Sequence, residues 1–211
     1  MACTPVVIGI SGGSSAGKTT FTDRLAQKLV DLSPTVLNQD RYFRNWSALP
    51  EAEREIARTA NHPRAVLWEP LIAHVESLSR GEPIEVPPPG TRAFDQGNKS
   101  ETVSPGELVI VEGHLIFGQE ALRALFELKI FLDVDTHERV LRRMLRDTAN
   151  NRSLDEVVAW YRRDVIPNFA VHTEPTRQYA DLIVPFEGEV DTAIEVVANG
   201  VRGLVASKSQ A

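Results

Sequence analysis

The chain has 211 residues, 42% of them hydrophobic, with a single cysteine and a formal net charge of −6. This length favours a single domain over residues 1–211 that needs no disulfide framework, and the acidic charge argues against a nucleic-acid partner, because phosphate binding requires clustered cations. No stretch approaches the roughly 20 apolar residues of a membrane span, so we expect a cytoplasmic protein without a membrane partner.

The first predicted element is a strand that leads into a phosphate-binding loop. Residues 6–10 are apolar, and residues 12–19 read GGSSAGKT, a complete P-loop. Backbone N–H groups of such a loop surround phosphates, Lys18 reaches their outer oxygens, and the Thr19 hydroxyl is placed to bind Mg²⁺. A predicted helix over residues 20–32 points its positive end at the same anion. The predicted nucleotide-binding residues are Gly12, Gly13, Ser14, Ser15, Ala16, Gly17, Lys18, Thr19 and Thr20.

Four more strand-like apolar runs follow, separated by segments whose apolar residues have helical spacing. We expect strands at residues 35–37, 108–111, 129–132 and 182–184, and helices at residues 70–78, 121–126, 136–146 and 191–205. Strands that alternate with helices are typical of a parallel sheet, and right-handed crossovers place helices on both of its faces. The predicted fold class is therefore α/β, with a P-loop NTPase-type parallel sheet.

Residues 81–105 break this alternation. The segment contains five prolines, which exclude a central strand. Long loops in compact domains are often binding loops or lids. We predict an irregular substrate-binding loop over the active face, with a stiff surface loop as the alternative.

Acidic side chains follow two of the predicted strands. Asp40 comes shortly after residues 35–37, and Glu112 directly follows residues 108–111. Ligands of open parallel sheets bind beyond the carboxyl ends of the strands, which is where both carboxylates should lie. Asp40 could accept the proton of an attacking hydroxyl, and Glu112 has the position of a Walker B carboxylate. With Thr19 they form the predicted Mg²⁺ site. The alternative for each carboxylate is a helix cap or a surface charge.

A cationic helix face is predicted over residues 136–146. Its basic residues are Arg139, Arg142, Arg143 and Arg146, and Arg152 lies just beyond. A kinase needs mobile arginines that neutralise developing charge and help to exclude water. The alternative is a solvated helix with internal ion pairs, and Arg139 is the one that we expect to be structural.

Together these motifs resemble the uridine kinase family, within the wider group of uridine kinases and phosphoribulokinases. The resemblance covers nearly the whole chain. It extends to residues 131–135 (FLDVD) and to residues 174–185 (EPTRQYADLIVP), which look like the stretch leading into the last strand of the family. It implies ATP and Mg²⁺ as cofactors, Asp40 as catalytic base and Glu112 as support for the metal. It also implies that Lys18 acts on the phosphates, and that Arg143, Arg146 and Arg152 belong to a closing lid. The lid segment itself is predicted over residues 147–153.

The substrate side departs from the family pattern. Uridine kinases carry an acidic residue before a His-Pro pair to hold the ribose, whereas Asn61 precedes His62 here. The family's pyrimidine-binding loop supplies a histidine at the position where this chain has Phe94. The predicted substrate-binding residues are Asp40, Tyr42, Asn61, His62, Arg92, Phe94 and Glu112.

We therefore predict an ATP-dependent kinase that phosphorylates a hydroxyl of a small molecule. The resemblance favours the 5′-hydroxyl of uridine or cytidine, and it also implies a homo-oligomer. One alternative is the same chemistry on a sugar, a sugar phosphate or a vitamin-like alcohol; Arg64 and Arg92 could supply the cations that a phosphorylated acceptor would need. Another alternative is a nucleotide-binding regulator without transfer activity.

Overall fold

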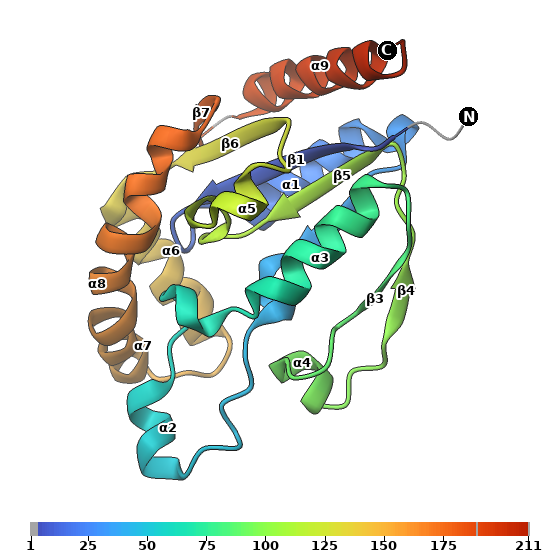
Figure 1. Cartoon of the computed structure of the whole chain (residues 1–211). Coiled ribbons are helices and arrows are strands. Elements are labelled where there is room, and N and C mark those ends of the chain that lie inside the picture. Colours follow the sequence, from blue (N-terminus) through green and yellow to red (C-terminus); the bar gives the residue numbers. More distant parts are fainter. Residues whose placement is uncertain (1–3, 189, 211) are drawn as a thin grey trace.

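A parallel sheet of five strands forms the centre of the computed structural model, which describes residues 4–188 and 190–210 (Figure 1). The strand order is β2-β5-β1-β6-β7, and all neighbouring pairs run parallel. The strands are β1 (Val6–Gly12), β2 (Thr35–Asn38), β5 (Leu108–Glu112), β6 (Leu128–Asp133) and β7 (Leu182–Pro185). Each contains one of the predicted apolar runs, so the predicted α/β sheet is confirmed.

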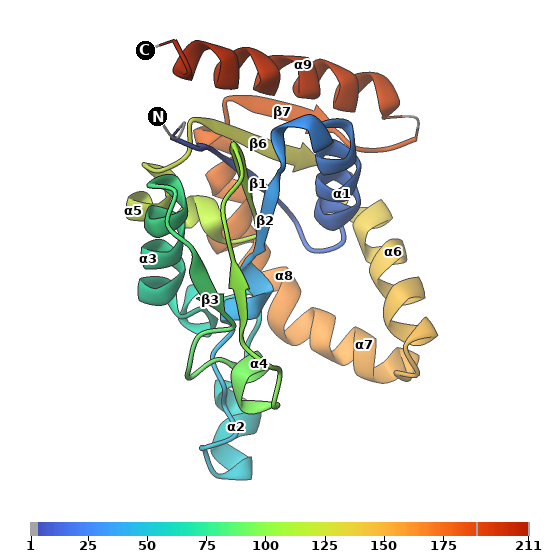
Figure 2. The same ribbon diagram turned by 90° about the vertical axis from the view of Figure 1, so that its right-hand side faces the viewer.

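Helices cover both faces of this sheet, as predicted (Figure 2). One face is covered by α1 (Lys18–Lys28) and α9 (Asp191–Lys208), and the other by α3 (Trp68–Ser79) and α5 (Glu120–Arg123). Because side chains alternate along a strand, Ile8 and Ile10 of β1 pack with α1 and α9, whereas Val7 packs on the opposite side with α3. A sheet covered on both faces explains why β1 and β5 are apolar almost throughout.

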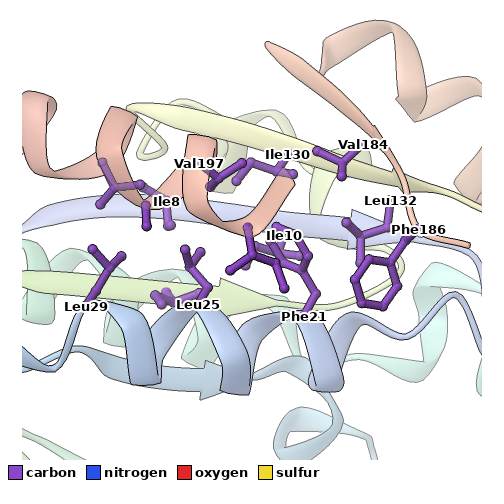
Figure 3. Packing of buried hydrophobic residues seen from close by; sticks show 14 of the residues in the cluster. Ile8, Ile10, Phe21, Leu25, Leu29, Ile130, Leu132, Val184, Phe186 and Val197 are labelled. Carbon is purple, nitrogen blue, oxygen red and sulfur yellow. The ribbon is translucent and has the colours of Figure 1, made fainter. Parts of the chain in front are cut away.

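The core between α1, α9 and the sheet is shown in Figure 3. Leu25 of α1 and Leu29, directly after this helix, face the strands, and Phe21 meets Phe186 edge-to-face with ring centroids 5.5 Å apart. Phe186 follows β7, so this contact joins the first helix to the last strand of the sheet. It also places the beginning of α1, and with it the P-loop, at the carboxyl ends of the strands.

An arm of two helices extends from the carboxyl end of β6. Asp135 begins α6 (Thr136–Ala149) by accepting a hydrogen bond from the backbone N–H of His137 at 2.8 Å. Ser153 begins α7 (Leu154–Trp160) through a capping box with Glu156. The predicted lid therefore comprises the last turn of α6 and its connection to α7. The chain then continues through η5 (Tyr161–Val165), α8 (Ile166–Asn168), η6 (Phe169–Thr173) and η7 (Glu174–Tyr179) (Figure 2).

Residues 81–105 are more regular than the sequence predicts. They contain the short antiparallel strands β3 (Ile84–Val86) and β4 (Glu101–Val103), with α4 (Arg92–Asp95) between them. Ile84 and Val86 are buried in the same cluster as α3, and the prolines at 87–89 follow β3 instead of interrupting it. This pair of strands forms a sheet of its own, apart from the central one.

Short helical segments complete the described chain. They are η1 (Val30–Leu32), η2 (Gln39–Tyr42), α2 (Glu51–Ala57), η3 (Pro63–Ala65) and η4 (Ile116–Gly118). The predicted single domain spans residues 1–211, of which residues 1–3, 189 and 211 lie outside the described part. None of the helices within residues 4–188 and 190–210 combines the length and the apolar character that crossing a bilayer requires.

Candidate active site

The P-loop lies between β1 and α1, and its backbone needs small residues. Gly17 precedes α1 with a φ of 84°, in the left-handed region that favours glycine. A Cβ atom on Gly13 would lie 2.2 Å from a guanidinium nitrogen of Arg139. Arg139 is buried, donates to the carbonyl of Val134 and the hydroxyl of Thr136, and lies over the ring of Phe169. Arg139 therefore packs against the P-loop at Gly13, in agreement with its predicted structural role.

Lys18 is a half-buried lysine at the mouth of this loop. Its Nζ donates to the carbonyl oxygens of Gly12 at 3.1 Å and Gly13 at 2.9 Å. Burial lowers the pKa of Lys18 to about 8, against the opposing effect of the Asp40 and Glu112 carboxylates. Because the hydrogen bonds of this half-buried ammonium go to neutral carbonyls, its charge is incompletely compensated, and these residues fit a polyanion such as a nucleoside triphosphate.

Glu112 and Thr19 meet beside Lys18. The Thr19 hydroxyl donates to the Glu112 carboxylate at 3.1 Å, and the Asn38 amide donates to the same carboxylate at 2.6 Å. Burial raises the pKa of Glu112, while Lys18, Thr19 and Asn38 oppose that shift. No group of three or more His, Cys, Asp or Glu side chains in the described residues could hold a metal alone. A hydroxyl with one or two carboxylates nonetheless fits Mg²⁺, which usually keeps water and substrate phosphates among its ligands.

Arginines of the α6–α7 arm reach the same region. Arg143 donates to the Ser14 hydroxyl of the P-loop at 2.7 Å and to Asp147 at 2.5 Å. Arg146 also donates to Asp147, and Arg152 lies 3.7 Å from it. The three arginines of the predicted lid therefore all lie near the Asp147 carboxylate. Of these three, Arg143 contacts the P-loop.

These groups surround a cavity of about 590 Å³ at the carboxyl ends of β1, β2 and β5. Its lining includes the predicted residues Ser14, Ser15, Gly17, Lys18, Thr19, Thr20, Asp40, Asn61, Arg92, Glu112, Arg143 and Arg146. It also includes Asn38, Phe43, Ala60, Gly113, His114 and Arg142, which were not among the predicted site residues. The cavity thus joins a phosphate-binding loop, two carboxylates and several cations.

The comparison with known proteins agrees with this arrangement. A model of the phosphoribulokinase / uridine kinase family matches residues 7–193. The chain belongs to this family. Uridine kinases of Oceanobacillus iheyensis and Lactiplantibacillus plantarum are 36% and 37% identical to it over 202 residues, which cover 95% of this chain and 96% of each relative.

Solved structures of P-loop kinases share the fold. A kinase from Silicibacter sp. TM1040, assigned to a fructose transport system, superposes with a TM-score of 0.68 over 86% of this chain and 90% of that one, at 21% identity. Phosphoribulokinase from Rhodobacter spheroides gives a TM-score of 0.50 at 15% identity, over 80% of this chain and 67% of that one. The predicted family, fold class and enzyme class, a phosphotransferase with a hydroxyl acceptor, are therefore confirmed.

Among the predicted site residues that are not part of the P-loop, four do not line the cavity of this kinase. Tyr42 is fully buried and its hydroxyl pairs with His74 at 2.8 Å, because the η2 turn directs Asp40 outward and Tyr42 into the core. This placement speaks against the predicted contact of Tyr42 with the substrate. His62 instead stacks edge-to-face on another histidine, His172, at 4.5 Å between ring centroids. The other two are Phe94 on α4, which is partly exposed, and Arg152.

Two residues that hold the acceptor side of this kinase were missed by the sequence analysis. His114 bonds through its Nε2 to the carbonyl of Ala60 at 2.9 Å, and burial together with Lys18 lowers the pKa of His114 to about 4. Asp164 is buried and accepts hydrogen bonds from the Thr59 hydroxyl, the Ala60 backbone at 3.0 Å and the Asn61 amide at 2.7 Å. The segment at residues 59–61 is therefore fixed by hydrogen bonds to two side chains from other parts of the chain.

Sequence signals for the missed residues differ. Asn38 pairs with Glu112 in the register of β2 and β5, so knowledge of the parallel pairing would have found it. His114 lies two residues after Glu112 and could have been noticed there. Asp164 lies 103 residues from Asn61 on a segment without a motif, and nothing local in the sequence connects the two.

Proposed function

We propose that this kinase transfers the γ-phosphoryl group of ATP to the 5′-hydroxyl of a pyrimidine nucleoside, uridine or cytidine, with Mg²⁺ as cofactor. The observation that carries the proposal is the single cavity in which Asp40 faces the P-loop residues Lys18 and Thr19 and the carboxylate of Glu112. The names of the relatives, which are uridine kinases over almost the full length of the chain, support the choice of acceptor.

The nucleotide side neutralises and orients phosphates. The P-loop amides and Lys18 would hold the triphosphate, and Arg143 and Arg146 would add positive charge from the arm. Thr19, Glu112 and Asp40 would hold Mg²⁺, which when bound neutralises phosphate charge and orients the phosphates. Phosphoryl transfer has a loose transition state, so such positioning and charge neutralisation account for most of the catalysis.

Asp40 would act as the base for the attacking hydroxyl. It is exposed to the cavity, and its backbone N–H donates to the Asn38 side chain at 2.6 Å. Because the Asn38 amide also donates to Glu112, one side chain fixes the base relative to the proposed metal site. Asp40 would take the hydroxyl proton as the new phosphorus–oxygen bond forms and the bond to the leaving diphosphate breaks.

The acceptor side offers a hydrogen-bond acceptor and an aromatic face. Asn61 uses its amide N–H on Asp164, which leaves its carbonyl oxygen free for a sugar hydroxyl at the cavity wall. Phe43 lines the same cavity and could stack against a base. Asn61 would thus take the place of the acidic residue that the family resemblance leads us to expect before His62.

The test is a coupled assay of ADP release with ATP and Mg²⁺. The panel comprises uridine, cytidine, purine nucleosides, ribose, pentose phosphates and pantothenate, with an acceptor-free control. We expect ADP release that depends on uridine or cytidine and far exceeds the control. Turnover with another alcohol and none with either pyrimidine nucleoside would reject the proposed acceptor, and equal ADP release without any acceptor would reject a kinase reaction.

A further inference from the structure

A second cavity, of about 500 Å³, adjoins the first one and shares Phe43, Ala60 and Arg92 with it. It lies between the segment around residues 44–47, the end of α2, the helix α4 and the C-terminal end of α7. Its most distinctive lining residues are Arg44, Trp46, Arg54, Arg58, Arg92 and Trp160. A small molecule whose hydroxyl reaches Asp40 can extend from one cavity into the other.

The second cavity is strongly cationic in a chain of net charge −6. None of its four arginines forms an ion pair with a carboxylate of the described residues. Among the residues that the structure describes, the only carboxylate in its lining is Asp95, which accepts a hydrogen bond from the Asn45 amide at 2.7 Å. The carboxylates of α2 are exposed and outside the lining. Elsewhere, arginines such as Arg80 and Arg202 do have carboxylate partners.

Aromatic rings lie near three of the four guanidinium groups. Arg44 lies 5.9 Å from the centroid of Trp46, Arg58 lies 5.2 Å from that of Trp160, and Arg92 lies 5.8 Å from that of Phe43. Arg54 donates to the carbonyl of Leu49 at 3.1 Å, yet its Nε is buried without a partner. A guanidinium that contacts a ring by its face keeps N–H donors at its edge, where they match the geometry of an oxyanion.

Of these arginines Arg92 also lines the first cavity, where Lys18, Arg143 and Arg146 already supply positive charge beside the P-loop. A neutral nucleoside gives Arg44, Arg54 and Arg58 no negative charge to bind. We propose that the second cavity binds a carboxylate carried on the ring of the acceptor, with Trp46 and Trp160 as aromatic walls. This inference rests on the proposed function and extends its substrate class to pyrimidine nucleosides that carry an acidic substituent on the ring. Arg58 and Arg92 bind the anion, and Phe43 at the junction contacts the ring.

Matched acceptors that differ only in charge test the inference. We would measure kcat/KM for 5-carboxyuridine and for its 6-carboxyl isomer, each against the corresponding carboxamide, with uridine as the reference. The proteins are the wild type, Arg58→Gln and the control Arg80→Gln, which removes an exposed arginine that pairs with Glu82 outside both cavities. The acid-to-amide ratio within each protein cancels any general loss of activity.

We expect at least one acid to be preferred about tenfold over its amide, which corresponds to about 1.4 kcal/mol. The preference persists in Arg80→Gln, falls toward one in Arg58→Gln, and shrinks at high salt because the arginines are exposed. If uridine is phosphorylated and neither acid is preferred by the wild type, the inference is wrong and the proposed function stands.

If no nucleoside is phosphorylated, tryptophan fluorescence titration with the same acids and amides separates the two claims. Binding of an acid but not its amide, abolished in Arg58→Gln, supports the anion site and rejects the proposed nucleoside kinase activity. Equal responses to acid and amide, or no response at all, reject both.

Discussion

Glu112 is the side chain on which the polar contacts of the site converge. It is 2% exposed and accepts hydrogen bonds from Thr19 of α1 and from Asn38 of the neighbouring strand β2. Asn38 in turn orients Asp40 through the backbone. Burial of a carboxylate costs desolvation free energy unless the carboxylate is hydrogen-bonded. Here each hydrogen bond joins a different residue of the site to the Glu112 carboxylate. Glu112 therefore fixes the relative positions of the P-loop, the proposed metal site and the proposed base.

Replacing Asp40 separates binding from catalysis. Asp40→Asn keeps the shape and the backbone bond to Asn38 but cannot accept the hydroxyl proton. We expect kcat to fall about 100-fold, at the lower end of the range for general bases because the transition state is loose, and the Kd for ATP to change less than about threefold. Steady-state kinetics and calorimetric titration measure the two quantities. Full activity in the variant would show that Asp40 is not the base.

Lys18 gives nucleotide binding a dependence on pH. The pKa of Lys18 is about 8 in the free protein, and a bound polyphosphate would raise it. Binding energy from the protonated ammonium is then fully present below pH 8 and is lost as pH rises, by up to about tenfold in Kd per pH unit. Calorimetric titration of MgATP from about pH 7.5 to about pH 9.5 measures the effect. Lys18→Arg is the control, because a guanidinium does not titrate in this range; an equal slope in both proteins would contradict the assignment to Lys18.

At the residue scale, the sequence was informative wherever function lies in one contiguous motif. Residues 12–19 could be assigned at once because a P-loop is local, and Glu112 because it ends a strand. Tyr42 could not, because the direction of its side chain depends on how the η2 turn packs against His74. Asp164 could not, because its partners lie more than 100 residues away and no local pattern encodes the contact.

At the scale of elements, the turn η5 connects the α6–α7 arm to the acceptor side. Its Asp164 is 3% exposed and bonds to residues 59–61, and Asn168 donates to the same carboxylate at 3.2 Å. Arg163 from the same turn donates to the carbonyl of Glu55, at the end of α2. The arm that carries the arginines of the predicted lid is therefore hydrogen-bonded to residues 59–61, of which Ala60 and Asn61 line the cavity.

Removal of the Asp164 carboxylate tests this connection. Asp164→Ala leaves the buried donors of Thr59 and Asn61 without an acceptor, so we expect the free energy of unfolding to fall by about 3 kcal/mol. Asp155→Ala on the exposed face of α7 is the control and should stay within about 0.5 kcal/mol of the wild type. Urea unfolding measures both; similar small changes in the two variants would mean that Asp164 does not hold the segment.

The strands within residues 81–105 show that a proline-rich composition can wrongly predict an irregular segment. The prolines of residues 81–105 predict an irregular course, yet β3 and β4 form within that segment. Alternating burial of Ile84 and Val86 against α3 stabilises the pair, and the prolines occupy the turn beyond it. The long central strands were easier to predict, because both faces of a covered parallel sheet are apolar.

At the scale of the whole molecule, α9 closes the face of the sheet that α1 covers, and it lies at the opposite end of the molecule from α2 (Figures 1 and 2). The alternation of strands and helices predicted this architecture, because few arrangements satisfy right-handed crossovers. The homo-oligomer implied by the resemblance stays a prediction.

Two glycines provide a matched test of this packing. Gly203 lies on the exposed side of α9, and a Cβ atom added there would meet no atom within 4 Å. Gly203→Ala should therefore raise the free energy of unfolding by about 0.5–1 kcal/mol and Tm by about 2 °C. A Cβ on Gly106, just before β5, would lie 1.8 Å from the carbonyl oxygen of Ser33, so Gly106→Ala should cost more than about 3 kcal/mol. Thermal unfolding followed by circular dichroism compares them, and a stabilising Gly106→Ala would contradict the packing described.

The proposed reaction is transfer of the γ-phosphoryl group of ATP to a nucleoside 5′-hydroxyl in the cavity that contains Lys18, Asp40 and Glu112. The most direct measurement is ³¹P NMR of the products formed from ATP, Mg²⁺ and uridine. We expect a phosphomonoester resonance that is split into a triplet by the 5′-methylene protons, with the ester formed in equal amount with ADP. Inorganic phosphate as the sole new product, or an ester on a secondary hydroxyl, would contradict it.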